Sequence, residues 1–468
     1  MDTLDILQLL PTLRDGINIA RFGQTASIGI LEGMGKRKIS WKSKSPWFCL
    51  LLLFLLFSCS SDHSSFEMNF ENKALRMDYL HTGSKDTSSV EFLAWKAEPF
   101  WGGSKWNLID DPLKGEFVIQ IFDTADDELI YSKGFSTLFS EWQTTDEALD
   151  TVKTFYESII IPFPKYEIRL RLSRRNKEQQ FHVIFETSFN PFYVPIKASP
   201  PPKYKVVKIL DAGDPSEYVD LVFLPEGYTK NEMEKFRQDV ERLTDTIFSW
   251  SPYDAYQGLF NIWIVEAPSE ESGTDIPQDG IWKNTILNSS FNTFNIDRYL
   301  TTSDFKSVRD LASCAPYDQI CIIVNHDKYG GCGIYNSYTI FTADNEMSEF
   351  LFMHEFGHGF VALADEYYSS DVPYTDFFDL TVEPYQENIT TLIDFQSKWR
   401  DMVDPNTPVP TPDDPIYFHT VGVFEGAGYQ AKGIYRPYHD CTMKSKTINN
   451  FCPICQRAIR RTIEGYMD

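Results

Sequence analysis

The sequence predicts an α+β protein, with an N-terminal antiparallel β-sandwich followed by a domain in which strands alternate with helices. Residues 67–199 show a period of two, for example over 166–172, where apolar residues alternate with charged ones. Three prolines at 200–202 form a stiff linker. From residue 203 to 468, apolar runs of strand length alternate with helical stripes, which indicates a second folded domain.

Composition limits the classes of partner. Of the 468 residues, 42% are hydrophobic and 15% are aromatic, enough for packed cores. The formal net charge is −24, which disfavours binding to nucleic acid or to an anionic bilayer surface. We therefore expect no nucleic-acid partner.

The first 59 residues have the pattern of an export signal. An apolar run at 46–58 is too short to span a bilayer as a mature helix, and five basic residues lie within 36–44. The run ends at Ser58-Cys59, which resembles a bacterial lipoprotein box with Cys59 as the lipidated residue. The alternative is an ordinary cleaved signal. Because a basic region normally opens a signal, we expect translation to begin at Met34 and residues 60–66 to form a tether.

These features predict an exported protein, anchored by lipid to the cell envelope on the periplasmic or outer side, or secreted. Within the sandwich, the aromatic residues could form a sugar- or protein-binding surface, but core packing is the favoured interpretation. They are Trp95, Phe100, Trp101 and Trp106.

The second domain begins with a buried strand at 219–224. Thr229 and Glu232 have capping-box spacing and precede a helical stripe that extends from Met233 to Ile247. Further strands are expected at 261–265 and 320–324. The glycine-rich segment 329–333 is either a sheet edge open to an extended peptide or a plain hairpin turn.

The segment His354-Glu355-Phe356-Gly357-His358 is the most informative part of the sequence. On a helix, the two histidines lie one turn apart on the same face and can bind one Zn²⁺. Glu355 lies about 100° round that helix, in the general-base position of a zinc peptidase. With 8 histidines in the chain, the pattern is expected by chance only about 0.01 times.

Catalytic zinc normally has a third protein ligand. Asp365 lies about 10 Å beyond His358 on a straight helix, so it can bind only if the chain turns back between 359 and 363. Asp365 is the favoured candidate. Glu366 comes next, and a remote Glu383 or Glu387 remains possible.

Cys452-Pro-Ile-Cys455 allows two interpretations. It could form half of a structural zinc site with His439 and Cys441. In an exported protein, a disulfide among the three cysteines is favoured. Nearby, Met443 on a tight turn could pack beneath the histidines, and Tyr435 or Tyr438 could donate a hydrogen bond to an oxyanion.

Three stretches resemble the bacterial IgA peptidase family of metzincin-like zinc peptidases. They are His354–Tyr367, Asp220–Tyr228 and Tyr435–Cys455. The resemblance covers about residues 205–468, and the sandwich resembles the N-terminal domain of some members. It implies a metzincin-like α/β zinc-peptidase domain with His354, His358 and Asp365 as ligands, Glu355 as base and Met443 as the Met-turn.

The resulting expectation is a Zn²⁺-dependent endopeptidase that acts on exported or extracellular proteins and contacts the membrane only through Cys59. The resemblance does not imply IgA specificity, because the chain lacks large accessory regions. Two alternatives stay open. One is a surface protein- or glycan-binding lipoprotein with an idle zinc domain, and the other is a zinc amidase acting on cell-wall peptides.

Overall fold

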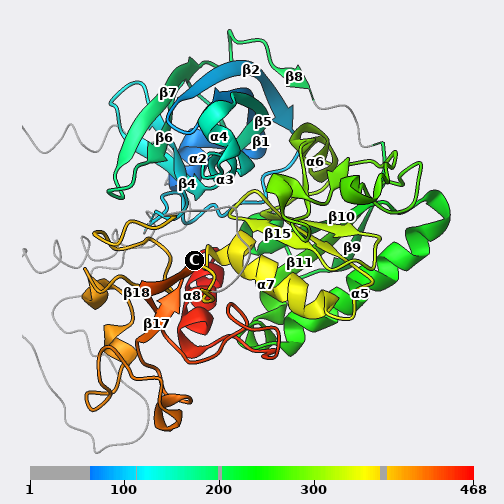
Figure 1. Ribbon diagram of the computed structural model, residues 1–468. Helices are drawn as coiled ribbons and strands as arrows, with labels where there is room; N and C mark the ends of the chain where they lie inside the picture. The colour runs from blue at the N-terminus through cyan, green and yellow to red at the C-terminus, as the bar shows by residue number, and fades with distance from the viewer. Residues whose placement is uncertain (1–63, 112, 199–202, 369–376, 468) are drawn as a thin grey trace, which may run out of the picture. The chain divides into compact units, whose positions relative to one another are not determined.

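The computed structural model describes residues 64–111, 113–198, 203–368 and 377–467 (Figure 1). The expected signal, the start at Met34, Cys59 and the linker at 200–202 lie outside the described residues. Helix α2 (Ser64–Asn69) occupies the last part of the expected tether. No helix within the described residues is long and apolar enough to cross a bilayer.

The chain is a mixed α+β protein in which sheets predominate. The N-terminal region contains two four-stranded sheets. The first has the order β5-β1-β2-β8 and comprises β5 (Lys153–Pro164), β1 (Phe70–Gly83), β2 (Ser88–Glu98) and β8 (Lys197–Ala198). The second has the order β4-β3-β6-β7 and comprises β4 (Leu129–Phe135), β3 (Phe117–Asp123), β6 (Ile168–Arg175) and β7 (Phe181–Phe189). All neighbours pair antiparallel except β2 and β8, which pair parallel.

The two sheets share one apolar core, to which β1 contributes Met77, β3 Ile119 and β6 Leu170. This packing is the physical reason for the period of two in the sequence, since alternate residues face the core. Trp95 and Trp101 are buried in it, as expected, whereas Phe100 is exposed. Short helices α3 (Leu138–Trp142) and α4 (Glu147–Asp150) follow β4.

The second region is organised around a six-stranded sheet of order β15-β16-β14-β10-β11-β9. Its strands are β15 (Gly331–Ile334), β16 (Tyr338–Thr342), β14 (Gln319–Val324), β10 (Val219–Glu226), β11 (Phe260–Glu266) and β9 (Lys205–Leu210). The four inner strands are parallel, and β9 and β15 run antiparallel at the two edges. The strands expected at 219–224, 261–265 and 320–324 are confirmed, each one or two residues longer.

Helices cover both faces of this sheet. Helices α5 (Met233–Ser249), α7 (Ser348–Val361) and α8 (Pro453–Glu464) pack on the face that carries Leu221 and Phe223 (Figure 1). Helix α6 (Phe305–Ala312) packs on the opposite face, against Val222 and Leu224. The capping box at the start of α5 is present as expected. Two small sheets complete the region: β12 (Ser289–Ser290) with β13 (Thr301–Thr302), and β17 (Phe424–Ala427) with β18 (Gln430–Arg436).

An ion-pair cluster joins β1 of the sandwich to α6. The Arg76 side chain is 1% exposed and lies 2.8 Å from Asp78 and 2.9 Å from Glu98, and it also pairs with Asp310 of α6. A buried guanidinium is costly unless carboxylates surround it. The cluster therefore fixes the contact between the sandwich and this helix.

Candidate metal centre

Helix α7 ends in a way that turns the chain back on itself. It stops at Val361, and Ala362 adopts a left-handed conformation with φ 62°. The Ala362 and Leu363 amides donate hydrogen bonds to the His358 and Gly357 carbonyls. This is the break that a ligand beyond the helix requires.

His354 and His358 face each other across one turn of α7. Their Nε2 atoms are 3.3 Å apart. The Nδ1 atom of His354 lies 3.0 Å from the Thr442 carbonyl oxygen, and that of His358 lies 2.6 Å from the Leu363 carbonyl oxygen. A carbonyl can only accept a hydrogen bond, so both Nδ1 atoms carry the proton and both Nε2 atoms are available as ligands.

Asp365 completes a group of three. Its Oδ1 atom lies 3.1 Å from Nε2 of His354 and 3.3 Å from Nε2 of His358, and it is buried with no hydrogen-bond partner. The other oxygen, Oδ2, accepts a hydrogen bond from the Tyr429 hydroxyl. Burial alone would raise the pKa of Asp365, but the two imidazoles lower it well below its ordinary value. The ligand atoms of these three residues lie within 4.8 Å of one another.

The other candidate third ligands lie elsewhere. Glu366 contacts Asn388 and Cys455. Glu383 accepts a hydrogen bond from the Asp394 amide, and Glu387 pairs with Lys114 at 2.7 Å and with Arg461 at 3.0 Å. The structure therefore brings Asp365, and none of these three glutamates, to the histidines.

Glu355 lies in a cavity of about 660 Å³ together with His354, His358 and Asp365. Burial raises the pKa of Glu355, although the two imidazoles oppose that shift. A partly buried carboxylate with a raised pKa beside a metal-binding group has the environment of a general base.

The edge strand β15 forms one wall of this cavity. A β-carbon at Gly333 would lie 2.0 Å from the Glu355 carbonyl oxygen, and one at Gly331 would lie 3.1 Å from Glu355 Cγ. The glycines therefore allow the strand to lie directly against α7. Segment 329–333 is both the start of a hairpin and a sheet edge, and Tyr299 forms an isolated parallel bridge with Gly331.

Met443 lies where the sequence predicts it, whereas the two tyrosines, Tyr435 and Tyr438, lie away from the cavity. Met443 is fully buried in the core beneath α7, as expected of a residue under the histidines. Tyr435 and Tyr438 are not among the residues that line the cavity. Tyr435 pairs with Thr390 through the backbone, and Tyr438 packs against the core below α7. The structure therefore does not bring either tyrosine to the cavity of the histidines, and their oxyanion role stays a prediction.

Four more residues line the cavity beside the three ligand candidates: Tyr329, Tyr367, Tyr429 and Arg298. Tyr329 and Tyr367 lie at the ends of segments that the sequence singled out, but neither was assigned a role in the site. Burial would lower the pKa of Arg298, but Tyr367 and Asp365 raise it. Tyr429 and Arg298 belong to no short motif, so spacing alone could not identify them.

The sandwich also contributes to the cavity. Glu141 of α3 lines it and accepts a hydrogen bond from the Tyr299 hydroxyl. Burial raises the pKa of Glu141 to about 7. The N-terminal region therefore places a titratable carboxyl in the cavity of Glu355.

The cysteine prediction needs correction. The six cysteines of the described residues are free thiols, and the Sγ atoms of Cys441 and Cys455 are 3.9 Å apart. The favoured disulfide among Cys441, Cys452 and Cys455 is absent from this part of the chain. His439 is not part of the cluster, because its ring stacks on Phe418.

Two imidazoles and a carboxylate that converge beside a partly buried glutamate form the donor set of a metallopeptidase. A family profile described as "IgA Peptidase M64" matches residues 207–419 and 413–463, and one described as "Peptidase M64 N-terminus" matches residues 65–186. The chain belongs to the IgA peptidase M64 family, a family of metallopeptidases. No curated protein matches the chain.

Proposed function

We propose that the protein is a zinc-dependent endopeptidase in which His354, His358 and Asp365 hold the metal and Glu355 moves protons. One observation carries the proposal: three acceptor atoms, two Nε2 and Asp365 Oδ1, face one another in a buried site. Family membership supports peptide-bond hydrolysis as the reaction.

The residues fit a cation. With both Nδ1 atoms donating to carbonyls, the inward Nε2 atoms and Asp365 Oδ1 carry only lone pairs. Such a set needs protons or a metal between its members. Accordingly, although burial lowers the pKa of His358, Asp365 raises it to about 9. Two nitrogens and one carboxylate oxygen match the three protein ligands of catalytic zinc.

A bound Zn²⁺ would act as a Lewis acid that acidifies water and polarises the scissile carbonyl. Glu355 takes a proton from the attacking water at a carboxylate oxygen and delivers it to the amide nitrogen that leaves. Its burial, which raises its pKa, makes it a stronger base than an exposed glutamate. The Tyr429 hydroxyl keeps Asp365 oriented towards the histidines.

The cavity suits an extended peptide. The edge strand β15 lines the cavity beside Glu355, and a sheet edge is a common place for an extended peptide to bind. Arg298 and Tyr367 also line the cavity and carry polar groups that a peptide could contact. These groups are not specific for one protein, so the proposal covers peptide substrates in general and does not include IgA specificity.

Glu355→Gln tests the proposal. The variant should keep its metal and lose cleavage of a panel of denatured proteins, and a chelator should abolish cleavage by the wild type. Glu349→Gln is the matched control, since Glu349 lies on the same helix with its side chain 55% exposed. Undiminished cleavage by Glu355→Gln would remove Glu355 from the mechanism. Cleavage of cell-wall peptides alone would favour the amidase, and no cleavage at all would favour the binding protein.

We also propose that the protein is exported and anchored through lipid on Cys59. The support is the basic segment, the apolar run at 46–58 and the Ser58-Cys59 junction. Radiolabelled palmitate should be incorporated by the wild type and not by Cys59→Ala. Equal labelling of both would exclude this anchor.

A further inference from the structure

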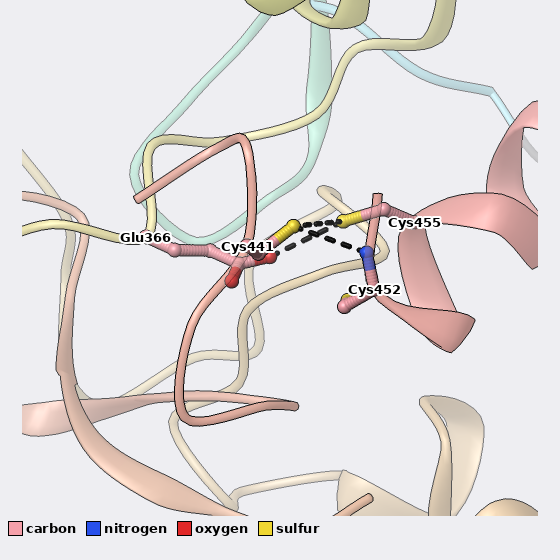
Figure 2. A group of neighbouring side chains, drawn as sticks. All are labelled: Glu366, Cys441, Cys452 and Cys455. Carbon is pink, nitrogen blue, oxygen red and sulfur yellow. Dashed lines mark hydrogen bonds between the residues drawn. The ribbon is translucent and has the colours of Figure 1, made fainter. Parts of the chain in front are cut away.

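A second cluster of metal-binding side chains lies on the other side of the segment that carries Asp365. It consists of Glu366, Cys441, Cys452 and Cys455, whose ligand atoms all lie within 4.8 Å of one another (Figure 2). Glu366 follows α7, Cys441 lies between β18 and α8, and the last two cysteines open α8. All four residues are buried, the most exposed being Cys452 at 4%.

The sulfur spacing distinguishes ligation from a disulfide. The Sγ atoms of Cys441 and Cys455 are 3.9 Å apart, whereas a disulfide needs about 2.05 Å. A tetrahedral zinc ion with Zn–S bonds of about 2.3 Å places two sulfur ligands about 3.8 Å apart. The observed spacing therefore suits two thiolates on one metal without movement of the chain.

The hydrogen bonds around the sulfurs support the same interpretation. The Cys452 amide donates to Cys441 Sγ at 3.2 Å, and an amide donor stabilises the negative charge of a thiolate ligand. Sγ of Cys455 lies 3.2 Å from Glu366 Oε1. Figure 2 shows the Cys441 and Cys455 sulfurs close to the Glu366 carboxylate.

The Glu366 carboxylate is the observation that requires an explanation. Glu366 has no exposed surface, and its Oε1 atom accepts a hydrogen bond from Asn388 Nδ2 at 3.0 Å. Its Oε2 atom is buried and has no hydrogen-bond partner. An unsatisfied carboxylate oxygen in a protein core costs free energy that a bound cation would offset.

We propose that Glu366, Cys441, Cys452 and Cys455 bind a structural Zn²⁺. Three sulfurs and one oxygen complete a tetrahedral shell, so no position stays open for water, as in structural zinc sites. On binding, each thiol releases its proton to solvent and becomes a thiolate. The metal would tie the segment after α7 to the start of α8, and it is separate from the metal of His354 and His358.

The number of zinc ions and the number of free thiols in the purified wild-type chain test the proposal. Elemental analysis should give two zinc ions per chain, and thiol titration after denaturation with chelator should find every non-lipidated cysteine reduced. One zinc ion together with two missing thiols would overturn the proposal in favour of a disulfide. One zinc ion with all thiols present would overturn it as well.

Variants assign each ion to its cluster. Cys452→Ser and His358→Ala should each keep one of the two zinc ions, whereas the control Cys321→Ser, which changes a buried cysteine of β14, should keep both. Full zinc content in Cys452→Ser would refute the second site. A reduced content in His358→Ala alone would place the only metal at the histidines, so failure here leaves the peptidase proposal standing.

Cobalt substitution covers the case in which Cys452→Ser does not fold. The wild-type chain reconstituted with Co²⁺ should show sulfur-to-cobalt charge-transfer absorption, because three thiolates would bind the metal. The His354, His358 and Asp365 site contains no sulfur and cannot produce that band. Absence of the band in cobalt-loaded wild type would overturn the proposal.

Discussion

The Met443 sulfur lies against Gly357, one residue before the second histidine of α7. A β-carbon at residue 357 would lie 2.8 Å from Met443 Sδ, closer than side-chain atoms normally approach. Met443 is fully buried and its carbonyl oxygen accepts a hydrogen bond from the Glu366 amide at 2.8 Å. The methionine therefore supports both the histidine helix and the segment that carries Asp365.

The first prediction concerns Gly357→Ala. In an ordinary helix this change stabilises by about 0.5–1 kcal/mol. Here the added methyl group displaces a buried sulfur, so we expect a loss of about 1–3 kcal/mol in unfolding free energy and weaker zinc binding. Urea denaturation and zinc competition measure both effects. The double variant Gly357→Ala/Met443→Ala should show a favourable coupling energy, and simple additivity would contradict the contact.

The second prediction concerns the third ligand. Asp365→Asn should weaken zinc binding by on the order of 100-fold or more, because it removes the charge between the two imidazoles. Tyr429→Phe, which removes the hydroxyl that donates to Asp365, should weaken zinc binding by about 10–100-fold. Asp327→Asn, with a side chain 84% exposed, is the control. Equal zinc affinity in Asp365→Asn and the control would exclude Asp365 as a ligand.

The third prediction concerns Asn388, which holds the same segment from the other side. Its amide accepts a hydrogen bond from Ala364 N and donates to Ala364 O, both at 2.8 Å. Asn388→Ala leaves these buried groups unpaired and should cost about 1–3 kcal/mol. Zinc affinity should fall together with the unfolding free energy. Asn406 is exposed, so Asn406→Ala should change neither the zinc affinity nor the unfolding free energy. Unchanged stability in Asn388→Ala would show that these hydrogen bonds do not hold the segment that carries Asp365.

The fourth prediction concerns pH. Burial raises the pKa of Asp310, but Lys306 and Arg76 lower it to about 2, below its ordinary value of 3.8. A lowered folded-state pKa stabilises the protein above the unfolded-state value, and the stabilisation is lost as pH falls from about 4 to 2. Asp310→Asn should therefore be less stable than wild type at pH 7, and the difference should close in that range.

The size of this effect should be modest, because the Asp310 side chain is 41% exposed. Urea midpoints of both proteins, measured with chelator present to remove any contribution from metal, give the comparison. A stability difference that stays constant from pH 7 to pH 2 would contradict an ionic role for Asp310.

The strands and the main helices could be predicted because their periodicities reflect burial. The alternation in β6 and the stripe of α5 both match the observed core. Spacing within α7 was likewise sufficient to put His354 and His358 on one face. These features depend on local geometry, which the sequence carries directly.

The position of the third metal ligand depends on a backbone conformation that the sequence does not predict. Zinc peptidases with a long motif turn at a glycine seven residues after the first histidine, a position that holds Val361 here. In this chain the left-handed residue is Ala362, one place later, and Asp365 is correspondingly one place beyond the usual ligand position. An alanine gives no turn signal, so the sequence favoured Asp365 over Glu366 but could not exclude Glu366.

The sequence was least informative where distant segments meet. Tyr435 does not line the cavity of the histidines; its backbone pairs with Glu425 of β17 and with Thr390, contacts that no local pattern encodes. The cysteines were assigned to a disulfide from the expected compartment alone. Glu366, which comes from a segment 75 residues before Cys441, could not be recognised as their neighbour.

Asp365 and Glu366 are consecutive residues whose carboxylates point in opposite directions, one to the imidazoles and the other to the sulfurs. Because a single peptide unit joins them, a displacement of the Glu366 carboxylate is expected to displace the Asp365 carboxylate as well. A mercurial or an oxidant that reacts with the sulfurs would therefore inhibit hydrolysis without entering the cavity that contains Glu355. Such an inhibitor would leave the substrate-binding cavity open while the Asp365 carboxylate no longer faces the two imidazoles.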